Sequence, residues 1–201
     1  VTSATTAGGV TRVDGWLEMP RYLTGDGGPG THLANGDRPD GIPAARGTMR
    51  DEFTCTLPAS ADGDHPSPTV LYGHGLLGSR MEVLGIGSFA ATAGIGMCAL
   101  DWLGMSSADI PPLVQAFDDL TGFRTVPDRL QQGELGFLLL GRLLRSPKGF
   151  ASDDAFQDAA GKPLIDTSRV SFLGASQGGI LGGVPAAVTK DWDAGTAIPR
   201  T

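Results

Sequence analysis

The sequence predicts an α/β fold in which helices cover both faces of a mostly parallel sheet. Three short apolar segments without strict alternation, at residues 69–75, 96–102 and 168–174, are typical of strands buried on both sides. Segments with helical spacing separate them, as in a sheet built from strand–helix–strand units. Two alternating segments come first, at residues 11–23 and 48–58, and predict outer antiparallel strands that feed the parallel series.

The N-terminal part of the chain, residues 1–47, is predicted to be an extension with one edge strand and a loop. Residues 1–10 are rich in Thr, Gly and Ala and are expected to be frayed. The edge strand ends at Pro20, and residues 24–47 form a loop dense in Gly, Pro, Asp and Asn. Residues 48–201 then form the main domain.

Four segments are predicted to be helical from their apolar spacing and their end signals. The longest, residues 126–147, has Pro127 in its first turn and Pro147 after its end. Its apolar stripe is predicted to face the core and consists of Leu130, Leu135, Leu138, Leu139 and Leu143. The other helical segments span residues 80–95, 107–122 and 177–192.

Charge and composition exclude several classes of function. The formal net charge is −7 and no basic run exists, so nucleic-acid binding, which needs a clustered positive patch, is not expected. No apolar run approaches the roughly 18 residues of a membrane span. No group of His and Cys has metal-ligand spacing, so no metal is expected.

The two cysteines, Cys55 and Cys98, allow at most one internal disulfide. Cys98 lies in an apolar strand and has the character of a small buried residue, and Cys55 pairs either with it or with a partner outside this chain. The opening sequence VTSATTAGG is typical of the mature end of a processed or trimmed chain. With the low lysine count, these features favour a secreted or periplasmic protein.

The most informative stretch is RVSFLGASQGGILGG, at residues 169–183. It predicts a buried strand that ends on the pattern G-x-S-x-G, formed by Gly174, Ser176 and Gly178, and a helix directly after it. A serine in so sharp a turn has a strained backbone, and a Cβ two residues to either side would collide across the turn. The sequence therefore predicts that Ser176 is a nucleophile. The alternative is a strand–glycine–helix junction with a chance serine.

A second motif, LYGHGLLGS at residues 71–79, brings a glycine-rich loop to the same edge of the sheet. Acyl transfer needs two N–H donors for the oxyanion of its tetrahedral intermediate. The residue after the nucleophile, Gln177, supplies one, and Gly75 lets the loop backbone approach closely. We expect the N–H of Leu76 to be the second donor, and His74 to fix the loop by a hydrogen bond.

The motifs GHGLLG and GASQGG, in the order strand, loop, strand, helices, strand and elbow, resemble the α/β-hydrolase superfamily. Within it, His-Gly-Leu is similar to the oxyanion loop of bacterial lipases and esterases. The resemblance covers roughly residues 48–192 and implies a Ser–His–Asp/Glu triad, an acyl-enzyme intermediate and no cofactor. Ser176 matches the nucleophile, and Leu76 and Gln177 match the oxyanion positions.

The chain departs from the family pattern in its triad, since the family's order is Ser, then Asp or Glu, then His. Every histidine of this chain precedes Ser176: His32, His65 and His74. The carboxylates after it, Asp191 and Asp193, stand at the end of the elbow helix, where the family's acid does not occur. An alternative triad would need His32 or His65 to fold back over the site.

The sequence therefore predicts an incomplete α/β-hydrolase domain over residues 48–201, with its C-terminal strands missing. Residues 197–201 are the expected start of the next strand. The acid and base are expected on the C-terminal half of the same hydrolase, either a missing segment or a second chain. The 201-residue chain alone is expected to be inactive.

Three residues are candidates for a substrate pocket at the carboxyl edge of the sheet, where ligands bind in open α/β folds: Trp102, Met105 and Leu77. For Trp102 and Met105, packing of a loop explains the pattern equally well. Leu76 and Leu77, together with helices over residues 107–145, alternatively form a cap over the site.

The predicted function is a serine carboxylic-ester hydrolase of lipase or esterase type. Its substrate would be a small-molecule, lipid or polyester ester that acylates Ser176. The same parts serve thioesterases, acyltransferases and peptidases. The alternative from another class is a non-catalytic α/β-hydrolase-like binding module.

Overall fold

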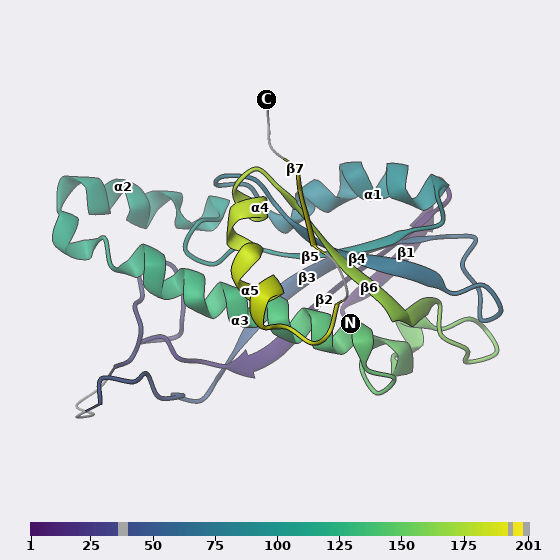
Figure 1. Ribbon diagram of the computed structural model, residues 1–201, viewed down its shortest axis with the longest axis horizontal. Helices are drawn as coiled ribbons and strands as arrows, with labels where there is room; N and C mark the ends of the chain where they lie inside the picture. The colour runs from purple at the N-terminus through teal and green to yellow at the C-terminus, as the bar shows by residue number, and fades with distance from the viewer. Residues whose placement is uncertain (36–39, 193–194, 199–201) are drawn as a thin grey trace.

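The computed structural model describes residues 1–35, 40–192 and 195–198, which form a seven-stranded sheet with helices on both faces (Figure 1). The strands are β1 (Ser3–Ala7), β2 (Val10–Pro20), β3 (Thr48–Pro58), β4 (Ser67–Gly73), β5 (Gly96–Leu100), β6 (Ile165–Ala175) and β7 (Gly195–Ile198). Their order across the sheet is β1-β2-β3-β5-β4-β6-β7. Strands β4 to β7 are parallel, whereas β1, β2 and β3 join them by antiparallel pairing.

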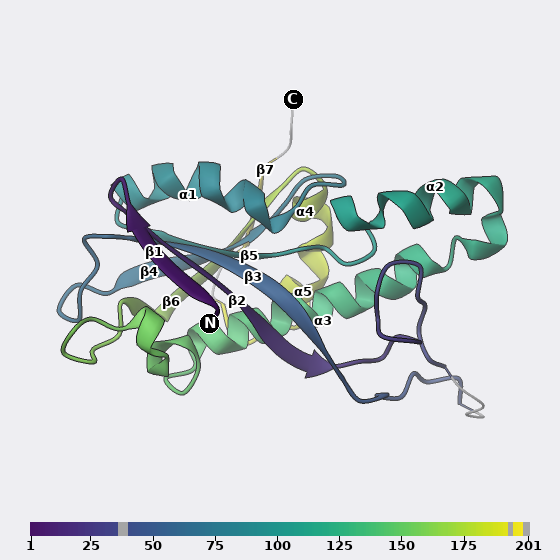
Figure 2. The same ribbon diagram turned by 180° about the vertical axis from the view of Figure 1, so that it is seen from behind.

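The α-helices are α1 (Val83–Thr92), α2 (Ile110–Asp118), α3 (Thr125–Arg145), α4 (Gln177–Leu181) and α5 (Gly183–Val188). Short 3₁₀ turns complete the connections: η1 (Arg80–Glu82), η2 (Ser107–Asp109), η3 (Leu120–Gly122), η4 (Phe150–Ser152) and η5 (Asp154–Phe156). Helix α1 covers one face of the sheet, and α3 with α5 covers the other (Figures 1 and 2). This arrangement confirms the predicted fold class.

The expectation of a frayed N-terminus is wrong, because β1 pairs with β2 as a hairpin from Ser3 to Asp14. The turn consists of Gly8 and Gly9, which both have positive φ angles, 59° and 79°, as a tight two-residue hairpin requires. Every side chain of β1 is exposed, so backbone hydrogen bonds to β2 hold the strand in place. Its sequence therefore shows no hydrophobic periodicity that would predict a strand.

Helix α3 packs most of its predicted leucine stripe against the core, as expected, but these leucines are only partly buried, and other residues of the helix are buried more deeply. Its buried residues are Val126, Arg129, Gln132, Gly133, Gly136, Phe137, Leu140, Gly141 and Leu144. A Cβ on Gly133 would lie 2.9 Å from the Leu103 nitrogen, and one on Gly141 would lie 2.4 Å from the Trp192 ring. Glycines therefore mark the face of α3 that lies closest to its neighbours, and most of the predicted leucines pack against the core on either side of that face.

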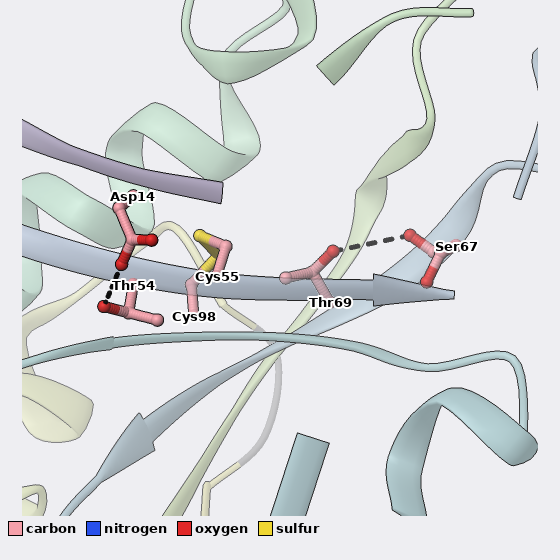
Figure 3. The surroundings of a disulfide bond; sticks show 6 residues. All are labelled: Asp14, Thr54, Cys55, Ser67, Thr69 and Cys98. Carbon is pink, nitrogen blue, oxygen red and sulfur yellow. Dashed lines mark hydrogen bonds between the residues drawn. A yellow bond between two sulfur atoms is a disulfide. The ribbon is translucent and has the colours of Figure 1, made fainter. Parts of the chain in front are cut away.

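Cys55 and Cys98 form a disulfide that joins β3 to β5 (Figure 3). The two residues stand directly opposite each other in the antiparallel ladder, and neither side chain is exposed. The bond settles the alternatives left open by the sequence. It ties the antiparallel strands to the parallel centre of the sheet, and Thr54 beside it donates a hydrogen bond to Asp14 at 2.8 Å.

Strand β7 lies at the sheet edge and pairs in parallel with β6, with Ala197 opposite Gly174 and Ile198 opposite Ala175. A further strand was expected to start within residues 197–201; it begins earlier, at Gly195, and residues 199–201 lie outside the described part. Within the described ranges, no helix has the length and apolar character needed to cross a bilayer.

Candidate active site

Ser176 stands between the end of β6 and the first residue of α4. Its backbone has φ 52° and ψ −117°, a conformation that residues with a side chain rarely adopt. Among the described residues, only one other non-glycine residue, Leu77, has a positive φ angle. Such strain persists only where the surroundings enforce it, and it concentrates at functional sites.

The two flanking glycines explain how this turn is enforced. A Cβ on Gly174 would lie 2.4 Å from the carbonyl carbon and oxygen of Gly178, across the turn. A Cβ on Gly178 would lie 2.2 Å from the carbonyl oxygen of Gly73, at the end of β4. Both distances are far below van der Waals contact. Glycine at these positions therefore lets α4 pack against β6 and β4 at once.

The loop that follows β4 lies at the same edge of the sheet as Ser176. Strands β4 and β6 are parallel neighbours, and Gly73 pairs with Gly174 in their register. The residues after Gly73 and after Gly174 consequently leave the sheet side by side. This contact brings together two motifs that are far apart in the sequence.

His74 holds this loop in place. Its side chain is fully buried, and its Nε2 accepts a hydrogen bond of 2.8 Å from the backbone N–H of Trp102. Because a backbone N–H can only donate, Nδ1 carries the ring proton and donates to the Gly75 carbonyl at 2.8 Å. Both ring nitrogens are thus occupied, and neither is free to act as a base for Ser176.

Glu82, in η1, also holds this loop, and the sequence analysis missed it. Its Oε2 accepts hydrogen bonds from the Gly75 N–H, at 3.3 Å, and from the Tyr72 hydroxyl, at 3.0 Å. The N–H of Leu76 has no hydrogen-bond partner in the described part of the chain, and the Leu76 side chain is 63% exposed. Of the Gly75 and Leu76 amides, the Leu76 N–H is therefore the one free to bind an oxyanion.

Gln177 supplies a second unsatisfied amide, since it is the first residue of α4 and its N–H has no partner within the helix. Its side chain is buried, and Nε2 donates a 3.5 Å hydrogen bond to the Met105 carbonyl. The segment after β5 also contacts the loop after β4, through a 2.8 Å hydrogen bond from the Ser107 N–H to the Gly78 carbonyl. The segments after β4, β5 and β6 thus meet around Ser176.

Trp102 does not line an open pocket, which corrects one of the predictions. Its side chain is fully buried and stacks on Phe137 of α3, with ring centroids 3.8 Å apart. Trp102 follows β5 and turns into the core between the sheet and α3, so its role is packing. Met105 and Leu77, in contrast, are partly exposed at this edge.

The other two histidines make no contact with Ser176. His65 precedes β4, and its side chain is 84% exposed beside Asp62. It therefore lies at the amino end of a strand whose carboxyl end faces Ser176, about 20 Å away along the strand. His32 contacts Arg124 at 2.6 Å and the Leu33 carbonyl at 3.1 Å, in the N-terminal loop.

The carboxylates after Ser176 do not complete a triad among the described residues either. Asp191 forms an ion pair of 2.7 Å with Arg142 on α3. Asp193 lies outside the described residues. No group of three or more His, Cys, Asp or Glu side chains in the described ranges is arranged to hold a metal ion.

A cluster of charges lies at the carboxyl edge of the parallel strands, between the start of β3 and the end of β5. Arg80 donates to Asp101 twice, from its backbone N–H at 2.5 Å and from Nη1 at 3.0 Å. Arg80 directly follows the loop after β4, so the pair fixes the end of that loop to the segment that follows β5. Burial, followed by the negative charge of Asp101, raises the pKa of nearby Asp51 to about 8.

Comparison with solved structures identifies the fold. The match to a cold-adapted esterase from an Arctic intertidal metagenomic library covers 98% of this chain, with TM-score 0.54 and 12% identity. An S-formylglutathione hydrolase from Agrobacterium tumefaciens matches 98% of the chain, with TM-score 0.52 and 16% identity. An acetyl xylan esterase from Paenibacillus sp. R4 matches 96%, with TM-score 0.50 and 14% identity.

The chain spans 64%, 61% and 51% of the lengths of these three proteins, respectively. No family model matches the chain, and no curated protein matches it. At such low identities the likeness concerns the fold alone. The described residues have the α/β-hydrolase fold, as the two sequence motifs implied.

Proposed function

We propose that this chain carries the nucleophile and the oxyanion hole of an ester hydrolase that works through an acyl-enzyme on Ser176. The observation that carries the proposal is the backbone of Ser176, with φ 52° and ψ −117° between two glycines that admit no Cβ. This geometry lifts the hydroxyl above the sheet and aims the start of α4 at the same point. Three solved structures with this fold are named as an esterase, a hydrolase of S-formylglutathione and an acetyl xylan esterase.

The proposed reaction has two steps on one serine. Ser176 Oγ attacks the ester carbonyl carbon while a base takes its proton, and the amides of Leu76 and Gln177 hold the oxyanion. The tetrahedral intermediate collapses, the bond to the alcohol breaks, and the alcohol leaves with the proton. Water then attacks the acyl-serine in the same way, which releases the acid and restores the Ser176 hydroxyl.

The base and its orienting acid are proposed to lie on further polypeptide, either a longer form of this chain or a second chain. Two features support this proposal. No described histidine contacts Ser176, and the face of α4 and α5 beside the edge strand β7 exposes apolar side chains. Ile180 is 79% exposed, Val184 51% and Val188 63%, which suits a surface that further strands and helices cover.

The protein is proposed to work outside the reducing cytosol, in a secreted or periplasmic setting. The buried disulfide between Cys55 and Cys98 supports this location, because disulfides persist mainly in oxidising compartments. An ester substrate at this edge would lie beside Leu76, Leu77 and Met105, which are partly or largely exposed there.

A fluorophosphonate probe tests the proposal, because it labels a serine only when that serine is activated. We expect labelling of a longer form that includes the triad histidine, loss of labelling in Ser176→Ala, and no change in Ser88→Ala, which alters an exposed serine of α1. Residues 1–201 alone are expected to remain unlabelled. Labelling that persists in Ser176→Ala would overturn the nucleophile assignment.

A non-catalytic binding module is the competing function, and one observation favours it: Ser176 has no base within the described residues. The same experiment separates the two functions. A folded longer form that contains further strands and histidines, and yet remains unlabelled at Ser176, would support the binding module.

A further inference from the structure

A cavity of about 670 Å³ lies between the N-terminal loop and the start of α3, apart from Ser176. Three arginines line it, Arg21, Arg46 and Arg124, together with His32 and Asn35. No carboxylate is among the described residues of its wall. Figures 1 and 2 both show this loop, between β2 and β3, beside the first turns of α3. The volume falls within the range of small-molecule sites.

Backbone hydrogen bonds build the wall of this cavity. Arg21 and Arg46 pair through the Arg46 N–H and the Arg21 carbonyl at 2.7 Å, and the Ala34 N–H donates to the Tyr22 carbonyl at 2.7 Å. The Leu33 N–H donates to the Asp128 carboxylate on α3 at 2.9 Å. These bonds fix the loop relative to the helix, so the backbone positions of the arginines are well defined.

Arg21 contributes a positive charge that only neutral groups contact. Its Nη1 donates to the Leu23 carbonyl at 2.8 Å and to the Gly25 carbonyl, and its Nη2 donates to the Arg46 carbonyl. Carbonyl oxygens satisfy its hydrogen bonds and leave its full charge uncompensated. This guanidinium therefore acts as a fixed positive charge behind the cavity.

Arg124 contributes a second charge, at the N-cap of the 21-residue helix α3. Its Nη2 donates to His32 Nε2 at 2.6 Å, and His32 Nδ1 donates to the Leu33 carbonyl at 3.1 Å. The imidazole accepts a hydrogen bond from the guanidinium, so it orients the Arg124 side chain without contributing a negative charge. The positive end of the α3 dipole lies beside this group.

The absence of counter-charge sets these arginines apart. Several other arginines pair with carboxylates: Arg12, Arg80, Arg129, Arg142 and Arg169. Within the described ranges, Arg21, Arg46 and Arg124 form no such ion pair. Asp128 is near, but its carboxylate receives the Leu33 N–H. In a chain with net charge −7, three unpaired arginines around one cavity make a local positive field.

We propose that this cavity binds a small organic anion, whose carboxylate or phosphate group pairs with Arg46 and Arg124 under the field of Arg21. Guanidinium groups match the planar oxygens of such anions. The cavity lies towards the same edge of the sheet as Ser176. Strand β3 begins beside the cavity and runs antiparallel to β5, so the start of β3 lies at the edge where the parallel strands end. The proposal does not depend on ester hydrolysis.

Binding to the purified chain tests the site directly. We would titrate citrate and inorganic phosphate at constant ionic strength and follow backbone amide shifts of Thr24, His32 and Asn35 together with calorimetric affinity. Arg46→Gln and Arg124→Gln each remove a charged contact, which is expected to weaken binding by about tenfold or more. Arg142→Gln, which removes an exposed arginine from another part of α3, is expected to leave the affinity unchanged.

The anion could be a free ligand or the acidic group of a substrate, and a second arm separates these sources. If the site binds an acidic group of the substrate, Arg46→Gln in an active longer form should raise KM for an acidic ester and leave KM for its neutral analogue unchanged. If the site binds a free ligand instead, wild type and Arg46→Gln should have equal KM values for both esters, and the wild-type protein should still bind citrate or phosphate. Absence of binding at millimolar anion, or equal binding by wild type, Arg46→Gln and Arg124→Gln, overturns the proposal.

Discussion

The imidazole of His74 accepts the backbone N–H of Trp102 at 2.8 Å, and this bond joins the segments that follow β4 and β5. On its other side, the same ring donates to the Gly75 carbonyl. The ring thus fixes the loop after β4, and its side chain is fully buried. His74 therefore holds the loop after β4 in place, and neither of its ring nitrogens is free to act as a base.

Replacing His74 by alanine is expected to destabilise the fold. The change leaves the Trp102 N–H without its partner in a buried setting, which costs about 1–3 kcal/mol. Urea unfolding of the two proteins measures the difference. His65→Ala is the matched control, since that side chain is 84% exposed, and it should change stability by less than about 0.5 kcal/mol. Equal effects of the two replacements would contradict the buried role of His74.

Gly178→Ala is expected to disrupt the elbow. The added methyl group would lie 2.2 Å from the Gly73 oxygen, so α4 would have to move away from β4, at a cost of about 1–3 kcal/mol or more. Gly85→Ala, in α1, is the control, because no atom lies within 4 Å of its Cβ position. That replacement should stabilise the helix by about 0.5–1 kcal/mol. Thermal unfolding of both variants provides the comparison.

The elbow was predictable from the sequence because its determinants are local. Gly174, Ser176 and Gly178 lie within five residues, and strand and helix patterns flank them directly. The position of the loop after β4 beside this elbow was predictable for the same reason. Glu82 was not, because its role depends on a contact across the loop with Gly75 that no residue spacing reveals.

The errors have a similar origin in tertiary structure. Hydrophobicity identified α3 as a helix with leucines towards the core. It did not reveal that the most deeply buried face carries Gly133, Gly136 and Gly141, because glycine adds nothing to an apolar pattern. Trp102 was placed at a strand end correctly, but only its stacking on Phe137 shows that it faces the core. The three-arginine cavity forms because residues 21, 46 and 124 line the same space, although they are far apart in the sequence, and no local sequence pattern predicts it.

Removing the disulfide by the double replacement Cys55→Ala and Cys98→Ala is expected to lower stability. The bond closes a separation of 43 residues, for which the chain-entropy relation gives about 4 kcal/mol. Urea unfolding of the oxidised wild type against the double variant measures this loss. Two thiols that react in the native oxidised protein would contradict the bond.

Asp51 is expected to make the stability of the protein fall as the pH rises. Its folded-state pKa is raised to about 8 from an ordinary 3.8, by burial first and by the charge of Asp101 second. Between these two values the unfolded state loses the proton while the folded state keeps it. The folded state binds more protons there, so this group lowers the free energy of unfolding steadily across that window and no further above it.

Asp51→Asn tests this relationship, because the amide has nearly the same shape and stays neutral at every pH. Wild type and variant should differ least near pH 4, and the advantage of the variant should grow up to about pH 8, where it levels off. Urea unfolding at several pH values provides the measurement, and Asp118→Asn, on the exposed face of α2, serves as the control. A difference between wild type and Asp51→Asn that stays constant from pH 4 to pH 8 would mean that Asp51 is already ionised in the folded protein. In that case the neighbouring Arg80 would outweigh burial and the charge of Asp101, and the carboxylate would belong to the ion-pair cluster that holds the end of the loop after β4.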